Sequence, residues 1–180
     1  KDKTVKIGES VIPDDNKKIE RVFLKPADCK PTVDALKSIK EADVIVIGPG
    51  SLYTSIIPNL LIEGIADAIK ESNACKIYIC NVMTQPGVTT DYTVGDHIKA
   101  IFKHSDEKLF DYVVVNNGKG TDILTKRYEK EGAYHVKIDK KRIESQGVIM
   151  VEDDLLCTKT YLRHESDELA DIIFRISESR

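Results

Sequence analysis

The segment from Gly48 to Ser55 (GPGSLYTS) joins two glycines to four hydroxyl side chains. Glycine lets a backbone turn sharply and come close to a ligand. Hydroxyl groups donate hydrogen bonds to anions, and a helix that begins here would add free N–H groups and a partial positive charge. The segment therefore predicts a phosphate-binding loop, and a glycine-rich turn without a ligand is the alternative. The candidate residues are Gly48, Gly50, Ser51, Tyr53, Thr54 and Ser55.

This loop differs from two common phosphate-binding motifs. A Walker loop carries a lysine after its glycines, and no lysine follows them here. In the GxGxxG motif a third glycine would stand where this chain has Leu52 and Tyr53. The loop thus indicates an anion site but does not identify the anion.

Two more polar loops follow apolar segments later in the chain. The segment from Asn81 to Thr93 is longer than the roughly 2–6 residues of most strand-to-helix connections, and long loops are often functional. Its amides and hydroxyls, with Asp91 as its one acid, favour hydrogen bonding to a sugar or a base over metal chelation. The segment after Val115 adds two amides and a lysine for a phosphate, and surface loops that bind nothing are the alternative for both. The candidate residues are Asn81, Thr84, Gln85, Asn116, Asn117 and Lys119.

The hydrophobic pattern predicts an α/β fold. Residues 44–47, 76–80 and 111–115 predict strands, and the continuous β-branched run at 44–47 is typical of a strand buried on both faces. Amphipathic segments predict helices at 31–42, 56–71, 94–104, 122–130 and 166–176. The alternation favours a Rossmann-like, mostly parallel sheet with helices on both faces. Since ligands of such sheets bind outside the carboxyl ends of the strands, the three polar loops should open on the same edge.

Weaker patterns predict further strands. Residues 5–12 alternate as a short hairpin and residues 19–24 as a strand. Residues 134–138 and 148–151 predict two strands that could pair with each other, and the basic run 137–142 predicts a solvated hairpin tip.

The sequence also predicts how the helix at 56–71 begins and where the domain boundaries lie. Ser55 should cap this helix, and Gly64 should stand in its middle at some cost in stability. We expect residues 1–180 to be the C-terminal portion of one Rossmann-like domain that is incomplete at the N-terminus, with residues 1–18 as a hairpin appendage.

Composition excludes several classes of protein. The net charge is −3, and no basic face is evident, so we expect no binding to nucleic acid. No apolar run approaches the roughly 20 residues that span a bilayer, which predicts no membrane insertion. The four cysteines form no CxxC pair, so we expect free thiols, no metal site and a cytoplasmic protein.

Histidines give weak signals for catalysis. His97 follows Asp96 at the start of a helix, and adjacent helical side chains diverge, so His97 is interpreted as a polar residue of the first turn. His104 stands at the end of the same helix, where the helix dipole favours its cation. No nucleophile–base pair is recognisable, and we assign no catalytic residue and no cofactor.

Four stretches of the sequence resemble one bacterial family. The stretch from Ala42 to Ile69 (ADVIVIGPGSLYTSIIPNLLIEGIADAI), KIYICNVMTQPG, and the DHIKAIFKH and DYVVVNN segments are similar to YvcK-type gluconeogenesis factors, which in turn are similar to 2-phospho-L-lactate transferases. The similarity runs from about Gly8 to the C-terminus. Family members carry a glycine-rich first strand and an Asp-Asp-Gly-Gly segment upstream of this region, and neither is in the chain. Where the family usually reads Pro-Gly-Glu-Thr, this chain has Val88 in place of the carboxylate, which weakens a transferase interpretation.

The resemblance implies a function as well as a fold. It implies a regulatory protein that binds a UDP-sugar such as UDP-N-acetylglucosamine and is required for growth on gluconeogenic carbon sources and for cell shape and wall morphogenesis. The alternative is a phospholactate transferase-like enzyme that uses a nucleoside-diphosphate-linked substrate, and a scaffold that binds other proteins is a third hypothesis. Arg163 is a candidate to pair with a diphosphate and Tyr128 to stack on a uracil ring. The oligomeric state is left open, and a homo-oligomer is compatible with the sequence.

Overall fold

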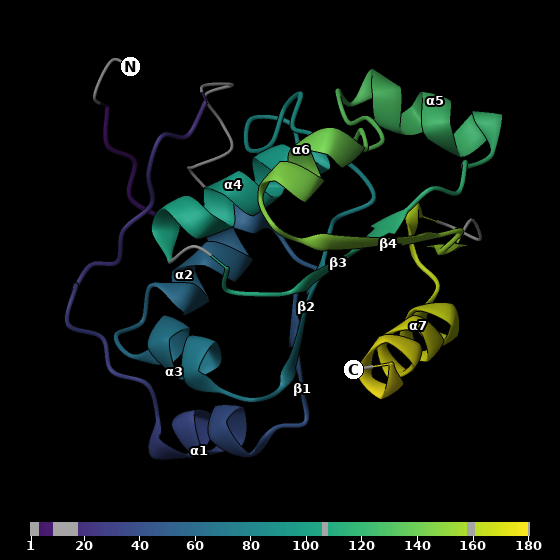
Figure 1. Cartoon of the computed structure of the whole chain (residues 1–180). Coiled ribbons are helices and arrows are strands. Elements are labelled where there is room, and N and C mark those ends of the chain that lie inside the picture. Colours follow the sequence, from purple (N-terminus) through teal and green to yellow (C-terminus); the bar gives the residue numbers. More distant parts are fainter. Residues whose placement is uncertain (1–3, 9–17, 106–107, 158–160, 180) are drawn as a thin grey trace.

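The computed structural model describes residues 4–8, 18–105, 108–157 and 161–179. Its centre is a parallel sheet of four strands in the order β1-β2-β3-β4 (Figure 1). The strands are β1 (Val44–Ile47), β2 (Cys75–Ile79), β3 (Tyr112–Asn116) and β4 (Ile149–Asp153). The predicted α/β fold with a parallel sheet is therefore confirmed.

Helices cover both faces of the sheet (Figure 1). One face carries most of them, and α7 (Ser166–Glu178) packs on the other. The remaining helical segments are α1 (Val33–Glu41), a π-helix (Leu52–Ile56), α2 (Ile57–Leu60), α3 (Ile65–Glu71), α4 (Val94–His104), α5 (Asp122–Lys130) and α6 (Lys140–Ser145). A short antiparallel pair, β5 (Leu156–Cys157) and β6 (Arg163–His164), precedes α7.

Alternating side chains of the strands divide the core into two clusters. Tyr78 and Val113 lie in the larger cluster, under the helices of the first face. Ile77 and Val114, their neighbours in the sequence, lie in the cluster formed with α7, where Ile172 is also buried. Strands with apolar side chains on both faces read as the continuous hydrophobic runs of the sequence.

The helix expected at 56–71 is instead broken. Gly64 has φ +85° and precedes α3, so it is a left-handed break and not a mid-helix residue. The preceding segment begins earlier, at Leu52, as a π-helix, and Ser55 lies inside it and caps nothing. Ser51 holds the N-terminal position, and the two segments Leu52–Leu60 and Ile65–Glu71 differ in direction by 74°.

Two strand predictions are wrong. Residues 19–24 form no strand, and the Val22 backbone N–H donates to Nε2 of His104 and not to a neighbouring strand. Residues 134–138 make only isolated bridges, Met83 with His135 and Thr93 with Lys137. β4 does not pair with them, because it pairs parallel with β3.

Two further predictions from the sequence concern hairpins at residues 137–142 and 5–12. Residues 137–142 are no hairpin tip, since α6 begins at Lys140. In the hairpin predicted at 5–12, residues 5–8 form no strand, and the rest lies outside the described residues.

Within the described residues no single helix has the length and apolar composition to cross a membrane. One bent pair, Leu52–Leu60 with Ile65–Glu71, meets that test only when both members are taken together.

The break at Gly64 yields the first prediction. Gly64→Ala should lower the free energy of unfolding by about 1–2 kcal/mol, because a left-handed backbone strains a residue with a Cβ atom. A Cβ atom at Gly64 would meet no atom within 4 Å, so the cost would come from the backbone alone. Urea denaturation measures the change. A continuous helix predicts the opposite sign, since Ala exceeds Gly in helix propensity by about 1 kcal/mol. Gly64→Asn should lose less stability than Gly64→Ala, because Asn tolerates the left-handed conformation better than Ala does.

Candidate functional site

The loop after β1 has a conformation that requires its first glycine. Gly48 has φ +81°, and a Cβ atom there would lie 3.0 Å from the carbonyl oxygen of Ile79. A side chain would therefore strain the backbone and crowd β2. The glycine lets the chain pass close over the end of the neighbouring strand.

The segment after this loop winds directly into the π-helix. The backbone N–H groups of Ser55 and Ile56 donate to the carbonyl oxygen of Ser51 at 2.9 and 3.0 Å. The N–H groups of the first turn of a helix have no partner within the helix, so they can bind an anion. π-Turns of this kind occur often at functional sites.

Hydrogen bonds join the loops that follow β1 and β2. The backbone N–H of Gly50 donates to Oδ1 of Asn81 at 3.2 Å, and Nδ2 of Asn81 donates to the Gly50 carbonyl oxygen at 2.8 Å. The hydroxyl of Ser51 donates to Oε1 of Gln85 at 2.8 Å. Of the three polar loops expected to open on one edge of the sheet, the loops after β1 and β2 are thus in direct contact there.

A cleft of ≈ 710 Å³ opens beside these contacts. Gly50, Ser51, Asn81 and Gln85 form its polar side. The opposite side comes from the β5–β6 hairpin and α7, which contribute Leu162, Arg163, His164, Ser166, Leu169, Ala170 and Ile173. Among the described residues, no aspartate or glutamate lines the cleft, and the only side chain of this lining that is always ionised is a guanidinium.

Of the two residues predicted to contact a nucleotide, Arg163 and Tyr128, Arg163 lies at the cleft. Its guanidinium carbon lies 5.2 Å from the centre of the Tyr161 ring, and that of Arg127 lies 6.0 Å from the same ring. Stacking on an aromatic ring limits the motion of a guanidinium while leaving its N–H groups available. Tyr128 does not line the cleft.

The third polar loop does not line the cleft either. Oδ1 of Asn116 accepts from the backbone N–H groups of Gly118 and Leu155, at 3.3 and 2.9 Å. Asn116 thus fixes the loop and the start of the β5 region, while Asn117 and Lys119 are exposed.

Four other candidate residues have structural surroundings. Tyr53 is buried, and its hydroxyl hydrogen-bonds to that of Tyr92 at 2.8 Å, away from the lining of the cleft. Thr84 is also buried and accepts from the backbone N–H of Tyr134 at 2.9 Å. Neither Thr54 nor Ser55 lines the cleft, and Ser55 is exposed.

Apart from Arg163, the wall formed by the hairpin and α7 was not found from the sequence. Its residues lie more than 75 positions after Asn81 along the chain and make no motif with it. Leu169 and Ile173 belong to an amphipathic stripe that indicates a core-facing helix, and they do pack against the α7 core cluster. A short apolar stripe at helical spacing does not indicate that its residues also line a cleft.

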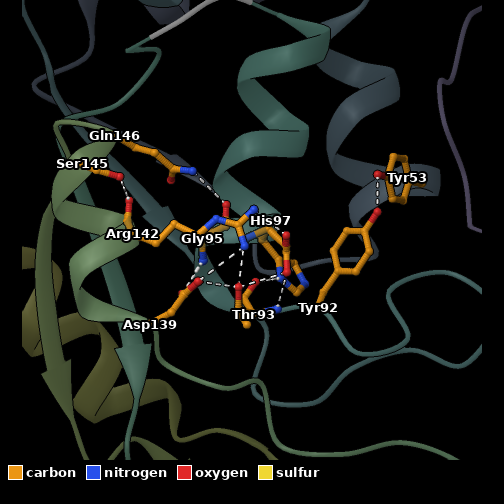
Figure 2. A network of polar contacts seen from close by, with 10 residues as sticks. Tyr53, Tyr92, Thr93, Gly95, His97, Asp139, Arg142, Ser145 and Gln146 are labelled. Atoms are coloured by element: carbon orange, nitrogen blue, oxygen red, sulfur yellow. Dashed lines mark hydrogen bonds and ion pairs between the residues drawn. The ribbon is translucent and has the colours of Figure 1, made fainter.

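A second polar cluster ties the end of the long loop to α6 (Figure 2). Thr93 and Asp96 form a capping box at the start of α4, as the sequence predicts. Asp139 accepts from the hydroxyl of Thr93 at 2.6 Å and from the backbone N–H of Gly95 at 2.8 Å. Arg142 pairs with Asp96 at 2.7 Å. Burial opposes ionisation of Asp96, but the bonds from Thr93 and the charge of Arg142 outweigh it and lower its pKa.

His97 lies within this cluster and not on the surface. It is fully buried, with Nδ1 2.8 Å from the carbonyl oxygen of Thr93, and Nε2 has no hydrogen-bond partner among the described residues. Burial lowers the pKa of His97, although the Thr93 carbonyl and the charges of Asp96 and Asp139 act in the opposite direction. His97 is therefore a neutral core residue.

The expectation for His104 is wrong. Burial is the main cause that lowers its pKa, and the charges of Lys103 and Arg21 act in the same direction. Its Nε2 accepts from the Val22 backbone N–H, which requires the neutral ring. The helix dipole is therefore not the dominant influence.

Among the described residues, no group of three or more His, Cys, Asp or Glu side chains is placed to hold a metal ion. The four cysteines are free, and Cys75 and Cys80 are buried.

The sheet, its helices and the cleft at its carboxyl edge define a Rossmann-like α/β protein with a candidate small-molecule site. The family model described as 2-phospho-L-lactate transferase CofD matches residues 1–156, and the chain belongs to this family.

Within this family, the chain is similar to proteins called gluconeogenesis factors. The chain is 46% identical over 173 residues to the gluconeogenesis factor of Halalkalibacterium halodurans and 41% identical over 167 residues to that of Bacillus subtilis. These alignments cover 96% and 92% of this chain but 54% and 53% of the relatives. A crystal structure of a UPF0052 family protein from Bacillus halodurans superposes with a TM-score of 0.90 at 46% identity, covering 93% of this chain and 54% of that one. The chain thus spans about half the length of the relatives it matches.

The buried histidine at the start of α4 yields the second prediction. His97→Asn should flatten the pH dependence of the free energy of unfolding below about pH 6.5. Because the pKa of His97 is lowered in the folded state, the unfolded chain binds an extra proton, and stability is lost as the pH falls through the unfolded value. Asn can keep a donor near the position of Nδ1 but does not titrate. In urea titrations between about pH 7.5 and 5.5, the slope should fall by up to about 1.4 kcal/mol per pH unit.

The comparison at about pH 7.5 is the internal control, because His97 is neutral there and the difference reports packing alone. Parallel profiles for the two proteins across the whole range would contradict the prediction.

Proposed function

We propose that this chain contributes one side of a binding site for a nucleoside-diphosphate-linked sugar of the UDP-N-acetylglucosamine type. The protein that contains it would be a regulator required for growth on gluconeogenic carbon sources and for cell shape and wall morphogenesis. The observation that carries the proposal is the cleft at the carboxyl edge of β1 and β2, to whose lining the described residues contribute a guanidinium and no carboxylate.

The lining suits the three chemical parts of such a ligand. The guanidinium of Arg163 suits a diphosphate, because it donates N–H groups to an anion, and Ser51 at the start of the π-helix lies on the same lining. The amides of Asn81 and Gln85 suit hydroxyl groups of a sugar. The apolar side chains of Leu162 and Ile173 suit the face of a ring. A volume of ≈ 710 Å³ falls within the range of about 300–1,000 Å³ of small-molecule sites.

The names of the relatives support the physiological part of the proposal. Proteins of two bacilli with more than 40% identity to this chain are called gluconeogenesis factors. A regulator needs a site that binds its ligand without converting it, and hydrogen-bond donors with an apolar wall are sufficient for binding.

A transferase is the second candidate, and the description of the matching family favours it. A phospholactate transferase-like enzyme would act on a nucleoside-diphosphate-linked substrate at the same cleft. Carboxylates for a magnesium ion would then come from outside the cleft lining described here. Incubation with a nucleoside-diphosphate-activated phospholactate and magnesium, with the product followed by chromatography, separates the two candidates: turnover favours the transferase.

The guanidinium at the cleft yields the third prediction. Arg163→Ala should weaken the binding of UDP-N-acetylglucosamine about tenfold or more, because a hydrogen bond to a charged group contributes about 1.5–3 kcal/mol. Isothermal titration calorimetry of a full-length protein that contains this chain gives the affinity. Absence of heat with the unsubstituted protein at millimolar ligand would contradict the proposed function.

Arg127→Ala is the matched control. Arg127 also lies over the ring of Tyr161, but it does not line the cleft. This variant should bind as tightly as the unsubstituted protein. An equal loss in both variants would show that the stack on Tyr161, and not contact with the ligand, determines the affinity.

A further inference from the structure

Gln85 lines the cleft beside Ser51, and two neighbouring loops hold it there. Its backbone N–H donates to the hydroxyl of Thr89 at 2.8 Å, and its carbonyl oxygen accepts from the backbone N–H groups of Val88 and Thr89 at 3.1 and 2.8 Å. Thr89 is buried, so this turn belongs to the packed structure. From the loop after β1, the hydroxyl of Ser51 donates to Oε1 of Gln85 at 2.8 Å. Gln85 is therefore held at its backbone by its own loop and at its side chain by the loop after β1.

The amide nitrogen of Gln85 is the part of the side chain that these contacts leave unused. No hydrogen bond joins Nε2 to another described residue. Nε2 is also absent from the buried side-chain atoms of the described residues that lack a partner, so it is open to solvent. Because Gln85 lines the cleft, a molecule bound there can reach this nitrogen.

The other amide of this wall is committed to the fold. Asn81 accepts from the backbone N–H of Gly50 at 3.2 Å and donates to the carbonyl oxygen of Gly50 at 2.8 Å. The oxygen of the Gln85 amide is occupied in the same way by Ser51, whereas both of its N–H bonds are unused by the described residues. An amide nitrogen donates hydrogen bonds and does not accept them, so this wall presents a donor to the cleft.

We propose that Nε2 of Gln85 donates a hydrogen bond to an oxygen of the ligand's sugar, and that Ser51 is the positioning residue for this contact. This deepens the proposed function and rests on it. By donating to Oε1, Ser51 sets which end of the amide is left for the cleft. Arg163 on the other wall suits the charged part of the ligand, whereas an uncharged amide donor suits an uncharged oxygen.

Two substitutions of similar size test the donor. Gln85→Met removes both polar groups of the side chain, whereas Gln85→Glu keeps an acceptor for Ser51 but carries no N–H group. In calorimetric titrations of the full-length protein with UDP-N-acetylglucosamine near pH 7.5, Gln85→Met should bind about three- to tenfold more weakly than the unsubstituted protein. Gln85→Glu should bind at least as weakly as Gln85→Met. With UDP, which lacks the sugar, Gln85→Met and the unsubstituted protein should bind alike.

A double-mutant cycle tests the role of Ser51. Ser51→Ala should weaken the binding of UDP-N-acetylglucosamine when Gln85 is present, but it should cause no further loss in the Gln85→Met background. The alanine keeps the backbone carbonyl oxygen of this position, which accepts from the N–H groups of Ser55 and Ile56. Additive losses would overturn the positioning role, because Ser51 would then act independently of Gln85.

Asn117→Asp is the matched control for charge. It makes the same change from amide to carboxylate at an exposed residue that does not line the cleft, and it should bind as tightly as the unsubstituted protein. Thermal unfolding of each variant shows whether it is folded.

Three outcomes would overturn the inference at Gln85. Equal affinity of Gln85→Met and the unsubstituted protein removes Gln85 from the contact. Undiminished binding by Gln85→Glu overturns the donor role, because an acceptor at this position would then suffice. A loss with UDP as large as the loss with UDP-N-acetylglucosamine overturns the contact with the sugar. If the unsubstituted protein binds neither compound, the proposed function fails first, and that outcome is distinct from binding that ignores position 85.

Discussion

In a parallel sheet the strands all end at the same edge, and the candidate site depends on this constraint. The pairing of β1 with β2 places Ile47 beside Tyr78, so the glycine loop after β1 starts next to the end of β2. Asn81 then turns adjacency into contact, because its one side chain both donates to and accepts from the backbone of Gly50. Such reciprocal bonding satisfies a backbone N–H and C=O that the irregular loop would otherwise leave without partners. The loop holds its shape before any ligand arrives, which reduces the entropy that binding must overcome.

The opposite wall of the cleft shows how one helix serves two purposes. Ile172 and Ile176 of α7 are buried against the sheet, and Leu169 and Ile173 pack at the border of that core while also facing the cleft. The helix is therefore held by burial that has nothing to do with a ligand. Arg163 and His164 precede it directly, so the polar groups of this wall take their positions from a rigid element.

Elements with strong, complete patterns could be predicted from the sequence, whereas irregular ones could not. The strands at β1, β2 and β3 are apolar runs that only a doubly covered sheet can bury, and their existence and parallel arrangement followed from that. The break at Gly64 was missed because the apolar stripe continues on both sides of it, and periodicity does not report a change of direction. Residues 19–24 alternate like a strand, yet Ile19 and Val22 pack on the core as an extended segment whose N–H at Val22 is satisfied by a histidine ring.

The site was predictable where its residues are close to a strand end, and unpredictable where they meet only through the fold. Ser51, Asn81 and Gln85 follow strands directly, and general rules for α/β sheets bring them together. The third loop also follows a strand end but lies one strand further along the sheet. There the side chain of Asn116 accepts hydrogen bonds from the backbone of Gly118 and Leu155. Hydroxyls in the first loop point in different directions around the π-helix, which is why Tyr53 faces the core and Ser51 the cleft.

Two histidines keep an unpaired ring nitrogen buried in different parts of the fold. His97 and His164 both have a buried Nε2 without a partner among the described residues, and burial lowers the pKa of both. His97 is enclosed in the core beneath the capping box of α4, next to the ring of Tyr92, so its unpaired nitrogen is a cost of fixing the loop to α6. His164 stands at the wall of a cleft that a small molecule can enter. Its Nε2 is nevertheless closed off from solvent, so at both positions the unpaired nitrogen is a cost that the packing around the ring imposes.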